Sequence, residues 1–574
     1  MKELMLGNEA VARGLFEAGV RVVSSYPGTP STEITENAAK YDEMRCEWAP
    51  NEKVAAEVAS GACLAGARAF CAMKHVGLNV AADPIFTMSY IGVNGGMVLG
   101  VADDPGMHSS QNEQDSRNHA IAAKLPMLEP ADSEDCRLFA KRAYDISEQF
   151  DTPVLLRLTT RIAHSRSIVN LEDRVEHELK EYTKNPAKNV MLPAFARPKH
   201  ILVEKRTLAL TEYAETSGIN TVEMNSTEIG VIAAGACYQY AKEALGDKAS
   251  YLKLGMVNPL PVKLIEDFAA KVGKLYVIEE LDPVIENHCK THGISVIGKE
   301  VFSLCGEISQ RIVREVVLGE TVENEKIDAE LPIRPPVMCC GCPHRGLFYA
   351  LKKAKVFVSG DIGCYTLGAS APLSMMDSCI CMGASVSALH GFNLARGVES
   401  EKKSVAVLGD STFIHSGITS LIDIAYNATN SVVIILDNSI TGMTGHQQNP
   451  TTGKNIKGEP AAAVDLEALC RAVGIERVRV VDPYDIKTTL AAVKEELEAD
   501  APSVIISRRP CALLKSVKHK PSLKVDADKC IGCKACLSIG CPAISLKNGK
   551  AVIDDTQCVG CGVCTGLCVK GAIE

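Results

Sequence analysis

The chain has 574 residues, of which 46% are hydrophobic, and a formal net charge of −9 at pH 7. One hydrophobic core does not extend over such a length, so several domains are expected. Lys and Arg form no long stripe, which argues against nucleic acid as a partner, because phosphate binding needs clustered basic residues. No apolar run reaches the length of a membrane span, and the N-terminal residues lack the pattern of a secretory signal. We therefore expect a cytoplasmic protein that binds neither nucleic acid nor membrane.

The cysteine content is high, with 23 cysteines in the chain. In the reducing cytosol disulfides are rare, so these thiols are not expected to pair with one another. Buried apolar packing and metal ligation are the two remaining roles, and the spacing of the cysteines decides between them.

The N-terminal part of the chain alternates strands and helices. Apolar strands are expected at 20–30 and 152–160, and a helix rich in Ala and Gly is expected at 51–73. This alternation predicts an α/β domain, which we place at 1–168. The residues that follow, 169–226, are rich in charge and are predicted to form a connector.

Two further blocks repeat the alternation. The predicted strands are 227–235, 251–259 and 274–281 in the second block, and 403–410, 430–438 and 502–510 in the third. Such spacing suits parallel sheets with crossover helices. We place the second domain at 227–330 and the third at 331–515, with a connector at 320–336 between their strand series. With a small metal domain at 520–574, the expected architecture is three doubly wound α/β domains and a cysteine-rich tail.

Eight cysteines in the last 45 residues form two regular runs. Three thiolates spaced two residues apart bind three corners of one [4Fe–4S] cube, and in two-cluster ferredoxins the distant fourth cysteine of each run ligates the other cube. This pattern assigns Cys530, Cys533, Cys536 and Cys568 to one cluster, and Cys558, Cys561, Cys564 and Cys541 to the other. The first run has one residue more than usual before Cys541, and Val569 stands where proline is expected. Two structural zinc sites are the alternative, but these would need paired C-x2-C motifs rather than triplets.

Two polar residues of the third block come directly after predicted strands. Asp410 follows Gly409 at the end of one strand, and Asn438 ends another strand 28 positions later. Open α/β sheets bind ligands at the carboxyl ends of their strands. A carboxylate and an amide oxygen are hard ligands that suit Mg²⁺ shared with phosphate groups. A Gly-Asp pair after a strand is more often only a turn, and it is the paired strand-end spacing that favours a site here.

The same residues resemble a known signature. Gly409-Asp410-Ser411 with Asn438 is similar to the thiamine diphosphate motif, with Ser411 where that family usually has Gly. The residues that the resemblance assigns to the cofactor or its Mg²⁺ are Gly409, Asp410, Ser411, Asn438 and the carbonyl of Ile440. The stretch 441–447 is similar to the cofactor and substrate loop of 2-oxoacid:ferredoxin oxidoreductases.

Thiamine chemistry also needs a carboxylate at the pyrimidine ring, which acts as a general acid–base. Asn51-Glu52, at the start of a helix rich in small residues, resembles the corresponding Ser-Glu segment of the same oxidoreductases. The resemblance therefore assigns the catalytic carboxylate to Glu52. Glu57, five residues later, is the competing choice, and both would otherwise be solvated helix positions.

A turn and a polar loop of the first block are candidates for substrate contact. The turn 26–31 resembles the substrate-contacting turn of the family, with Thr29 as the polar contact; alternatively it is only a strand-to-helix turn that ends in a Ser cap. In the polar stretch 103–117, Arg117 could hold a substrate carboxylate bidentately, although such a loop is more often simply solvated.

The order of the blocks resembles, over essentially the whole chain, the large (alpha) subunits of indolepyruvate ferredoxin oxidoreductases. That order is a pyrimidine-binding-type domain, a domain similar to the transketolase C-terminal domain, a diphosphate-binding domain and a two-cluster ferredoxin. Segments 339–345 and 360–365 are also similar to that family. The resemblance implies a thiamine-diphosphate-binding fold and oxidative decarboxylation of arylpyruvates such as indolepyruvate to aryl-acetyl-CoA, with electrons passing through the [4Fe–4S] clusters to ferredoxin. It also implies Mg²⁺, coenzyme A as co-substrate, and a smaller beta subunit in an α2β2 assembly.

Four further cysteines suggest a third cluster. Cys339, Cys342, Cys364 and Cys511 are at positions similar to the proximal-cluster ligands of other 2-oxoacid oxidoreductases. The alternative is that they are buried thiols that pack as small hydrophobes. His344 and His415 are candidate acid–base groups near the cofactor, although a lone histidine is more often structural.

Two other functions remain open from the sequence. One is a non-oxidative thiamine-dependent decarboxylase or ligase in which the cluster domain is only structural, which would release aldehyde without reducing a dye. The other is an electron-relay subunit without catalytic activity, which would bind no thiamine diphosphate.

Overall fold

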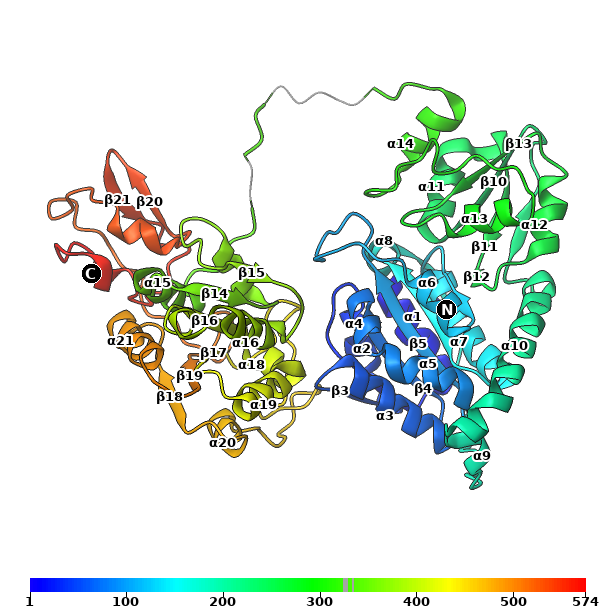
Figure 1. The fold of residues 1–574 in the computed structure, drawn as a ribbon. Coiled ribbons are helices and arrows are strands. Elements are labelled where there is room, and N and C mark those ends of the chain that lie inside the picture. The colour runs from blue at the N-terminus through cyan, green and yellow to red at the C-terminus, as the bar shows by residue number, and fades with distance from the viewer. Residues whose placement is uncertain (324–328, 333–334) are drawn as a thin grey trace. The chain divides into compact units, whose positions relative to one another are not determined.

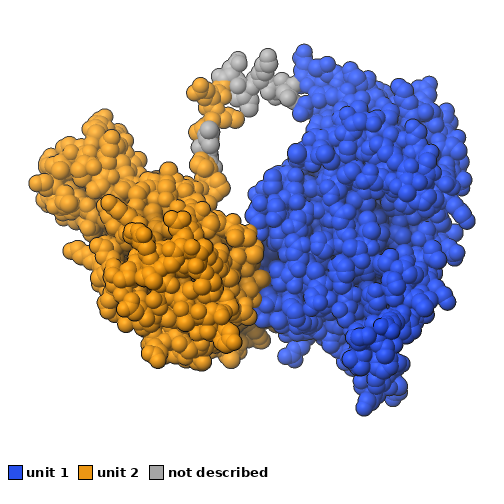
Figure 2. Space-filling view, in the orientation of Figure 1, with its two compact units in different colours: residues 1–328 blue, residues 329–574 orange. Residues whose placement is uncertain are grey.

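The computed structural model describes residues 1–323, 329–332 and 335–574. The chain forms two compact units, 1–328 and 329–574, and each is described by itself (Figure 1; Figure 2). The connector predicted at 320–336 includes seven residues that lie outside the described ones. Within the described ranges, no helix is both long enough and apolar enough to cross a membrane.

The first unit contains a seven-stranded sheet. Its strand order is β12 (Met256–Asn258), β6 (Met127–Leu128), β7 (Val154–Thr159), β5 (Met97–Asp103), β4 (Ala69–Lys74), β2 (Val22–Ser25) and β3 (Arg45–Trp48). All neighbouring strands are parallel except β12, which runs antiparallel to β6. The central strands are buried along their whole length because helices cover both faces.

The helices around this sheet form two layers. The helices are α1 (Gly7–Glu17), α2 (Thr32–Ala38), α3 (Glu52–Leu64), α4 (His75–Val80), α5 (Ala82–Ile91), α6 (Ser116–Ala123), α7 (Ser133–Phe150) and α8 (Thr160–His164). The strands β1 (Lys2–Leu6) and β8 (Arg166–Asn170) form a separate two-stranded sheet. One core contains Leu15 of α1 and Ala140 of α7, and the other contains Ala59 of α3 and Ile85 of α5. The sheet is therefore doubly wound, as predicted.

The helix predicted at 51–73 is shorter than expected. It ends at Leu64, and the last residues of the range belong to strand β4. Gly66 has a φ of +94°, and a Cβ there would lie 2.0 Å from the Lys180 carbonyl oxygen. The chain turns at this glycine because only a residue without a side chain fits the conformation and the close approach.

The second block of the first unit is a four-stranded sheet. Its order is β13 (Lys274–Ile278), β10 (Ile229–Ala234), β11 (Ser250–Leu254) and β9 (Thr221–Glu223), with α11 (Gly235–Leu245), α12 (Val262–Ala269), α13 (Val284–Thr291) and α14 (Gln310–Val313) around it. The strand predicted at 251–259 divides at Gly255 into β11 and β12, which belong to different sheets. Asn220 Oδ1 accepts hydrogen bonds from the Gly255 and Met256 N–H groups, both at 2.9 Å, and these bonds stabilise the interruption between the two strands.

The charge-rich segment predicted as a connector contains a long helix. Between α9 (Pro186–Asn189) and β9, helix α10 spans Pro193–Thr216 and contacts α5 and α12. Its buried residues Val203, Leu210 and Ala214 form a stripe too narrow to stand out against the charged residues around it. Packing against the domain, which a sequence pattern does not show, stabilises this helix.

The second unit is built on a six-stranded parallel sheet. Its order is β15 (Ser378–Cys379), β14 (Phe357–Gly360), β16 (Ser404–Gly409), β17 (Val432–Asp437), β19 (Ser503–Arg508) and β18 (Arg477–Val481). The helices are α15 (His344–Ala354), α16 (Ala384–Arg396), α17 (Val398–Glu401), α18 (Asp410–Thr412), α19 (Ile418–Asn427), α20 (Leu466–Ala472) and α21 (Ile486–Leu497). The strands predicted at 403–410, 430–438 and 502–510 are β16, β17 and β19, and each apolar run is buried.

The cysteine-rich tail contains a small hairpin. Strands β20 (Ile544–Lys547) and β21 (Lys550–Ile553) pair antiparallel, and two 3-10 turns lie at Ala535–Ile539 and Thr565–Leu567. Ile539 and Val563 of the tail belong to the same hydrophobic core as Leu347 of α15. The tail and the third α/β block therefore share one compact unit.

Candidate functional site

Asp410 and Asn438 lie at the same edge of the six-stranded sheet. Gly409, the last residue of β16, is in register with Leu436 near the end of β17, so the two parallel strands end side by side. Asp410 is 2% exposed and Asn438 is 7% exposed. The predicted strand-end pair is thus present as a buried polar cluster at the carboxyl edge of the sheet.

The environment of the Asp410 carboxylate suits a bound cation. Its oxygens accept hydrogen bonds from neutral donors, which include the Ser411 N–H at 2.9 Å and the Thr451 hydroxyl at 3.2 Å. Burial, followed by the nearby charge of Asp437, raises the pKa of Asp410 to about 7. A divalent cation at this carboxylate would offset the cost of burying the charge, so the donor set fits Mg²⁺.

The loop after β17 folds back over this carboxylate. Thr441 and Gln447 pair through two backbone hydrogen bonds of 3.0 and 3.2 Å, and the Asn438 amide oxygen accepts the Ile440 N–H at 3.3 Å. Because the loop folds back, Thr451 reaches hydrogen-bonding distance of Asp410, although the two residues are 41 positions apart in the sequence. Sequence reasoning missed Thr451, because no local pattern indicates which hydroxyl of a polar loop returns to a strand end. The role of the Ile440 carbonyl as a ligand stays a prediction.

Glu52 occupies the start of helix α3 in the first unit. The Asn51 side chain caps the helix by accepting the Val54 N–H at 2.9 Å, and Glu52 is 4% exposed. Glu57, the competing candidate, is exposed on the outer side of the helix and is ion-paired with Lys53. A general acid–base in a desolvated site has to be buried, so the geometry favours Glu52 over Glu57.

The turn around Thr29 packs closely against Lys74 at the end of β4. A Cβ on Gly28 would lie 3.0 Å from Lys74 Cβ, and the Ser31 hydroxyl donates to the Gly28 carbonyl at 2.8 Å. Ser31 thus closes the turn and makes no side-chain cap on α2. Lys74 is 7% exposed, its ammonium donates to the Ser109 carbonyl at 2.7 Å, and burial lowers its pKa to about 8. Sequence reasoning missed this lysine, which has the shifted pKa typical of functional groups.

Arg117 does not have the free guanidinium that substrate binding would need. It is 2% exposed, and its nitrogens donate to the carboxylates of Asp115 and Glu279, each as close as 2.6 Å. The Glu280 and Asp282 carbonyls accept further bonds, of 3.1 and 3.0 Å. The expectation that Arg117 is available to a substrate carboxylate is therefore wrong. The loop before it agrees with the alternative of a solvated loop, because residues 106–109 and 111–112 are exposed. Arg117 ties α6 to the end of β13, a contact between residues more than 160 positions apart.

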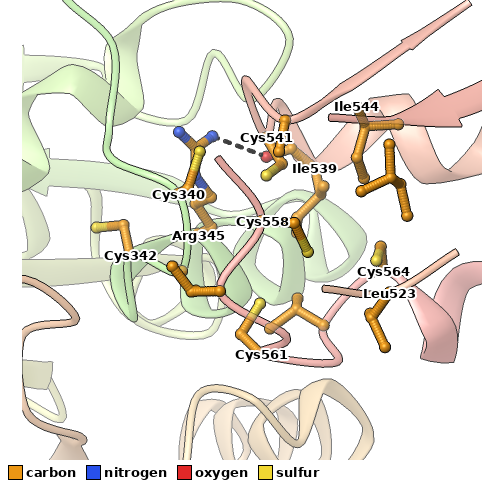
Figure 3. A pocket seen from close by; sticks show the side chains of 15 residues that line it. Cys340, Cys342, Arg345, Leu523, Ile539, Cys541, Ile544, Cys558, Cys561 and Cys564 are labelled. Carbon is orange, nitrogen blue, oxygen red and sulfur yellow. Dashed lines mark hydrogen bonds between the residues drawn. The ribbon is translucent and has the colours of Figure 1, made fainter. Parts of the chain in front are cut away.

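The eight cysteines of the tail line two hollows, four in each. One hollow is lined by Cys530, Cys533, Cys536 and Cys568, and the other by Cys541, Cys558, Cys561 and Cys564. Figure 3 shows the second hollow, whose lining also includes Cys342 and Cys340; Cys340 lies beside Cys541. The two sets coincide with the crossed pairing that the spacing predicts for two clusters. The identity of the ligands nevertheless stays a prediction.

Backbone groups around these thiols favour thiolates. The Ala572 N–H donates to Cys568 Sγ at 3.2 Å and the Gly560 N–H to Cys558 Sγ at 3.5 Å. Backbone hydrogen bonds from Ala551 and Gly532 lower the pKa of Cys530. Such donors tune cluster sulfurs. In the described part of the chain no group of three or more His, Cys, Asp or Glu side chains converges as a single metal ion would require, whereas a cube is larger than an ion and holds its ligands farther apart.

The four cysteines of the suggested third cluster lie in one region of the second unit. The pKa of Cys364 is raised to about 11 by burial and by the nearby Cys511 and Cys339, and that of Cys342 to about 12 by burial, with Cys364 and Cys339 also near. The Cys511 N–H donates to the Asn438 carbonyl at 2.9 Å. These thiols therefore adjoin the Asp410–Asn438 edge, although the segments that carry them are far apart in sequence.

The two candidate histidines are both buried. Burial lowers the pKa of His344 to about 4, and its ring packs edge-on against Tyr365. His344 is therefore neutral at physiological pH. His415 Nδ1 is 2.9 Å from the Ser416 hydroxyl.

Two family models match the chain. The model described as "Thiamine pyrophosphate enzyme, C-terminal TPP binding domain" matches residues 361–507, which include Asp410 and Asn438. The model described as "Pyruvate flavodoxin/ferredoxin oxidoreductase, thiamine diP-bdg" matches residues 13–230, which include Thr29 and Glu52.

Curated relatives extend the similarity to the whole chain. The "Indolepyruvate oxidoreductase subunit IorA" of Archaeoglobus fulgidus is 42% identical, over 100% of this chain and 97% of the relative. The protein of the same name from Pyrococcus horikoshii is 41% identical over the same shares. The "2-oxoglutarate synthase subunit KorA" of Archaeoglobus fulgidus is 26% identical over 55% of this chain and 99% of the relative. The chain therefore belongs to the family of indolepyruvate oxidoreductase IorA subunits.

Proposed function

We propose that the protein catalyses the oxidative decarboxylation of arylpyruvates such as indolepyruvate, forms aryl-acetyl-CoA with coenzyme A, and passes two electrons to ferredoxin. The main support is the combination within one chain of a buried carboxylate–amide pair, Asp410 and Asn438, with two hollows that are each lined by four cysteines of the tail. The pair suits a diphosphate anchored through Mg²⁺, and the hollows suit single-electron carriers. The names of the relatives provide the substrate class.

Thiamine diphosphate, when bound, supplies the nucleophilic carbon and the electron sink that decarboxylation of a 2-oxoacid requires. In our proposal Asp410, Asn438 and the Ile440 carbonyl hold the Mg²⁺ that binds the diphosphate, and Gly409 leaves room for the backbone to approach it. The buried Glu52 carboxyl holds or releases a proton at the pyrimidine ring, and Thr29 contacts the substrate. The raised pKa of Asp410 supports the first assignment, because a carboxylate in that environment gains from a cation.

Electrons leave through the tail in this proposal. Each hollow would hold one [4Fe–4S] cluster by its four tail cysteines, as the spacing predicts. A third cluster at Cys339, Cys342, Cys364 and Cys511 would receive the electrons first, since these thiols adjoin the edge where Asn438 lies. The partners that we propose are a smaller beta subunit in an α2β2 assembly and ferredoxin as the acceptor.

An anaerobic assay with the smaller subunit tests the proposed activity. We expect coenzyme A-dependent reduction of methyl viologen with indolepyruvate, and much slower reduction with pyruvate. Aldehyde release without dye reduction would instead indicate a non-oxidative decarboxylase, and purified protein that binds no thiamine diphosphate would indicate an electron-relay subunit. Either result would contradict the proposal.

Iron analysis tests the cluster assignments separately from activity. Cys558→Ala is expected to lose the iron of one cluster while the other remains. If a third cluster exists, Cys511→Ala loses a comparable amount; unchanged iron in this variant would remove the third site. Cys305→Ala, at an exposed cysteine of the first unit, is the matched control and should keep all its iron.

A further inference from the structure

The second hollow of the tail is lined by six cysteines, although a [4Fe–4S] cube takes four. Two of the six come from the loop before α15: Cys342, which lies near Cys364 and Cys339 of the suggested third cluster, and Cys340, which is separated from Cys541 by 201 positions. The side chain of Cys340 lies next to that of Cys541. In Figure 3 it lies beside Cys541, on the side away from Cys558, Cys561 and Cys564.

The tail thiols of this hollow group around Cys541 without Cys340. Cys541 and Cys558 lie near Cys561. The same two cysteines and Cys561 lie near Cys564. Among the groups that act most strongly on Cys340, Cys541 is the one cysteine. Cys340 is therefore placed as a neighbour of one cluster ligand, Cys541, rather than as a cluster ligand itself.

A buried arginine holds the two cysteine loops together. Arg345 is 4% exposed, and its guanidinium donates to the Cys339 carbonyl at 3.2 Å and to the Ile539 carbonyl at 3.2 Å, with a further bond to the Gly540 carbonyl. Cys340 directly follows Cys339 in the sequence, and Cys541 directly follows Gly540. The bond from Arg345 to Ile539 is drawn in Figure 3. The placement of Cys340 beside Cys541 is thus built into the packing of the tail on α15.

Glycine backbone conformations support the same close approach. Gly341 has a φ of +68°, and a Cβ there would lie 2.4 Å from Val559 Cγ2, next to Cys558. Gly540 has a φ of +69°, and its Cβ would lie 3.2 Å from an Arg345 nitrogen. A side chain at either of these glycines, each adjoining one of the two cysteines, would therefore be strained.

We propose that Cys340 is a positioning residue that donates a thiol hydrogen bond to the Cys541 ligand and raises the reduction potential of the cluster in that hollow. A donor stabilises the negative charge that a cluster sulfur gains on reduction, and hydrogen bonds to the sulfurs are one determinant of cluster potential. The other acceptor near Cys340 is Gln557 Oε1, at 3.9 Å. A ligand thiolate competes well against this neutral amide oxygen because bonds to charged acceptors are stronger. The inference rests on the cluster assignment of the proposed function.

Redox titration of the assembled, cluster-loaded protein, followed by electron paramagnetic resonance, tests the inference. Cys340→Ala should keep its iron but shift one of the cluster midpoint potentials to a more negative value, while the others stay unchanged. Cys340→Ser, which keeps a donor, should restore most of the shift. Cys305→Ala is the control and should show no shift.

Three results distinguish a failure of this inference from a failure of the proposed function on which it rests. If Cys340→Ala has the wild-type potentials with intact iron, no functional hydrogen bond exists and the inference is wrong. If Cys340→Ala loses iron, Cys340 is a ligand and the inference is also wrong. If the wild-type protein carries no cluster in this hollow, as Cys558→Ala with unchanged iron would show, the proposed function fails as well.

Discussion

The carboxylate of Glu52 lies against the backbone of Gly77, at the start of the neighbouring helix α4. A Cβ placed on residue 77 would lie 2.6 Å from Glu52 Oε1. The clash is with the end of a flexible side chain, so a methyl group there would displace the carboxylate rather than the fold. The absence of a side chain at one residue therefore decides where a candidate catalytic group points.

Gly77→Ala is expected to lower activity without lowering stability. Alanine favours the helix by roughly 0.5–1 kcal/mol over glycine, while the displaced carboxylate loses its alignment. Viologen reduction and thermal unfolding of the same preparation would measure both effects. Gly61→Ala is the matched control, because no atom lies within 4 Å of its added Cβ, and it should keep full activity. A Gly77→Ala protein with wild-type turnover would show that the position of Glu52 is not critical.

Glu52→Gln should reduce turnover by roughly 10²–10⁴-fold, the usual contribution of a general acid–base. Glu57→Gln should leave turnover nearly unchanged, because Glu57 is exposed and its pair with Lys53 lies on the surface. The measurement is kcat for indolepyruvate in the assembled enzyme. Loss of activity in the Glu57 variant, with normal activity in the Glu52 variant, would reverse the assignment.

Asp410→Asn should remove the stabilisation that Mg²⁺ and thiamine diphosphate confer together. For a ligand present at a hundredfold excess over its dissociation constant, binding stabilises the native state by about 2.7 kcal/mol, and the variant should lose most of this. Thermal unfolding with and without the two ligands measures the difference. Asp465→Asn is the control, since Asp465 is an exposed helix cap in the same domain and asparagine also caps helices. A ligand-induced shift that persists in Asp410→Asn would contradict the magnesium assignment.

Arg117→Ala should destabilise the first unit by about 3–5 kcal/mol, because it leaves the buried carboxylates of Asp115 and Glu279 without their partner. Arg161→Ala, which removes an exposed pair with Glu307, should cost about 1 kcal/mol or less. Urea unfolding compares the two variants. If Arg117→Ala unfolded like the wild type but bound substrate poorly, the structural role described for Arg117 would be wrong.

Glu280 should make the first unit less stable as the pH rises. Burial raises the pKa of Glu280 from 4.5 to about 7. Between these values the unfolded chain has released this proton and the folded chain retains it, so the free energy of unfolding falls with rising pH until both states are ionised. Glu280→Gln should therefore gain up to about 3 kcal/mol relative to wild type between about pH 5 and pH 8, measured by urea unfolding. Glu223→Gln should show no such gain, because its hydrogen bond with Lys242 lowers the pKa of Glu223. Equal pH profiles for wild type and Glu280→Gln would contradict the prediction.

The parallel strands and the cysteine runs could be read from local patterns. Strands β16 and β17 are continuous apolar runs because both faces of a parallel sheet are buried, and the polar residues at their ends follow directly. Helix α10 could not be read in this way, because its buried stripe is narrow and its stability comes from packing against α5 and α12.

The sequence by itself singled out the candidate residues for the chemistry: the strand-end pair Asp410 and Asn438, the eight cysteines of the tail, and Glu52 with Glu57 as its competitor. Only the tertiary structure decided which of the other polar groups reach these residues. It brings Thr451 to Asp410 and Cys340 to Cys541, and it engages the Arg117 guanidinium in a buried network of hydrogen bonds. The physical reason is that a spacing of two to four residues is a property of the local backbone, whereas a contact across tens or hundreds of positions depends on how whole elements pack.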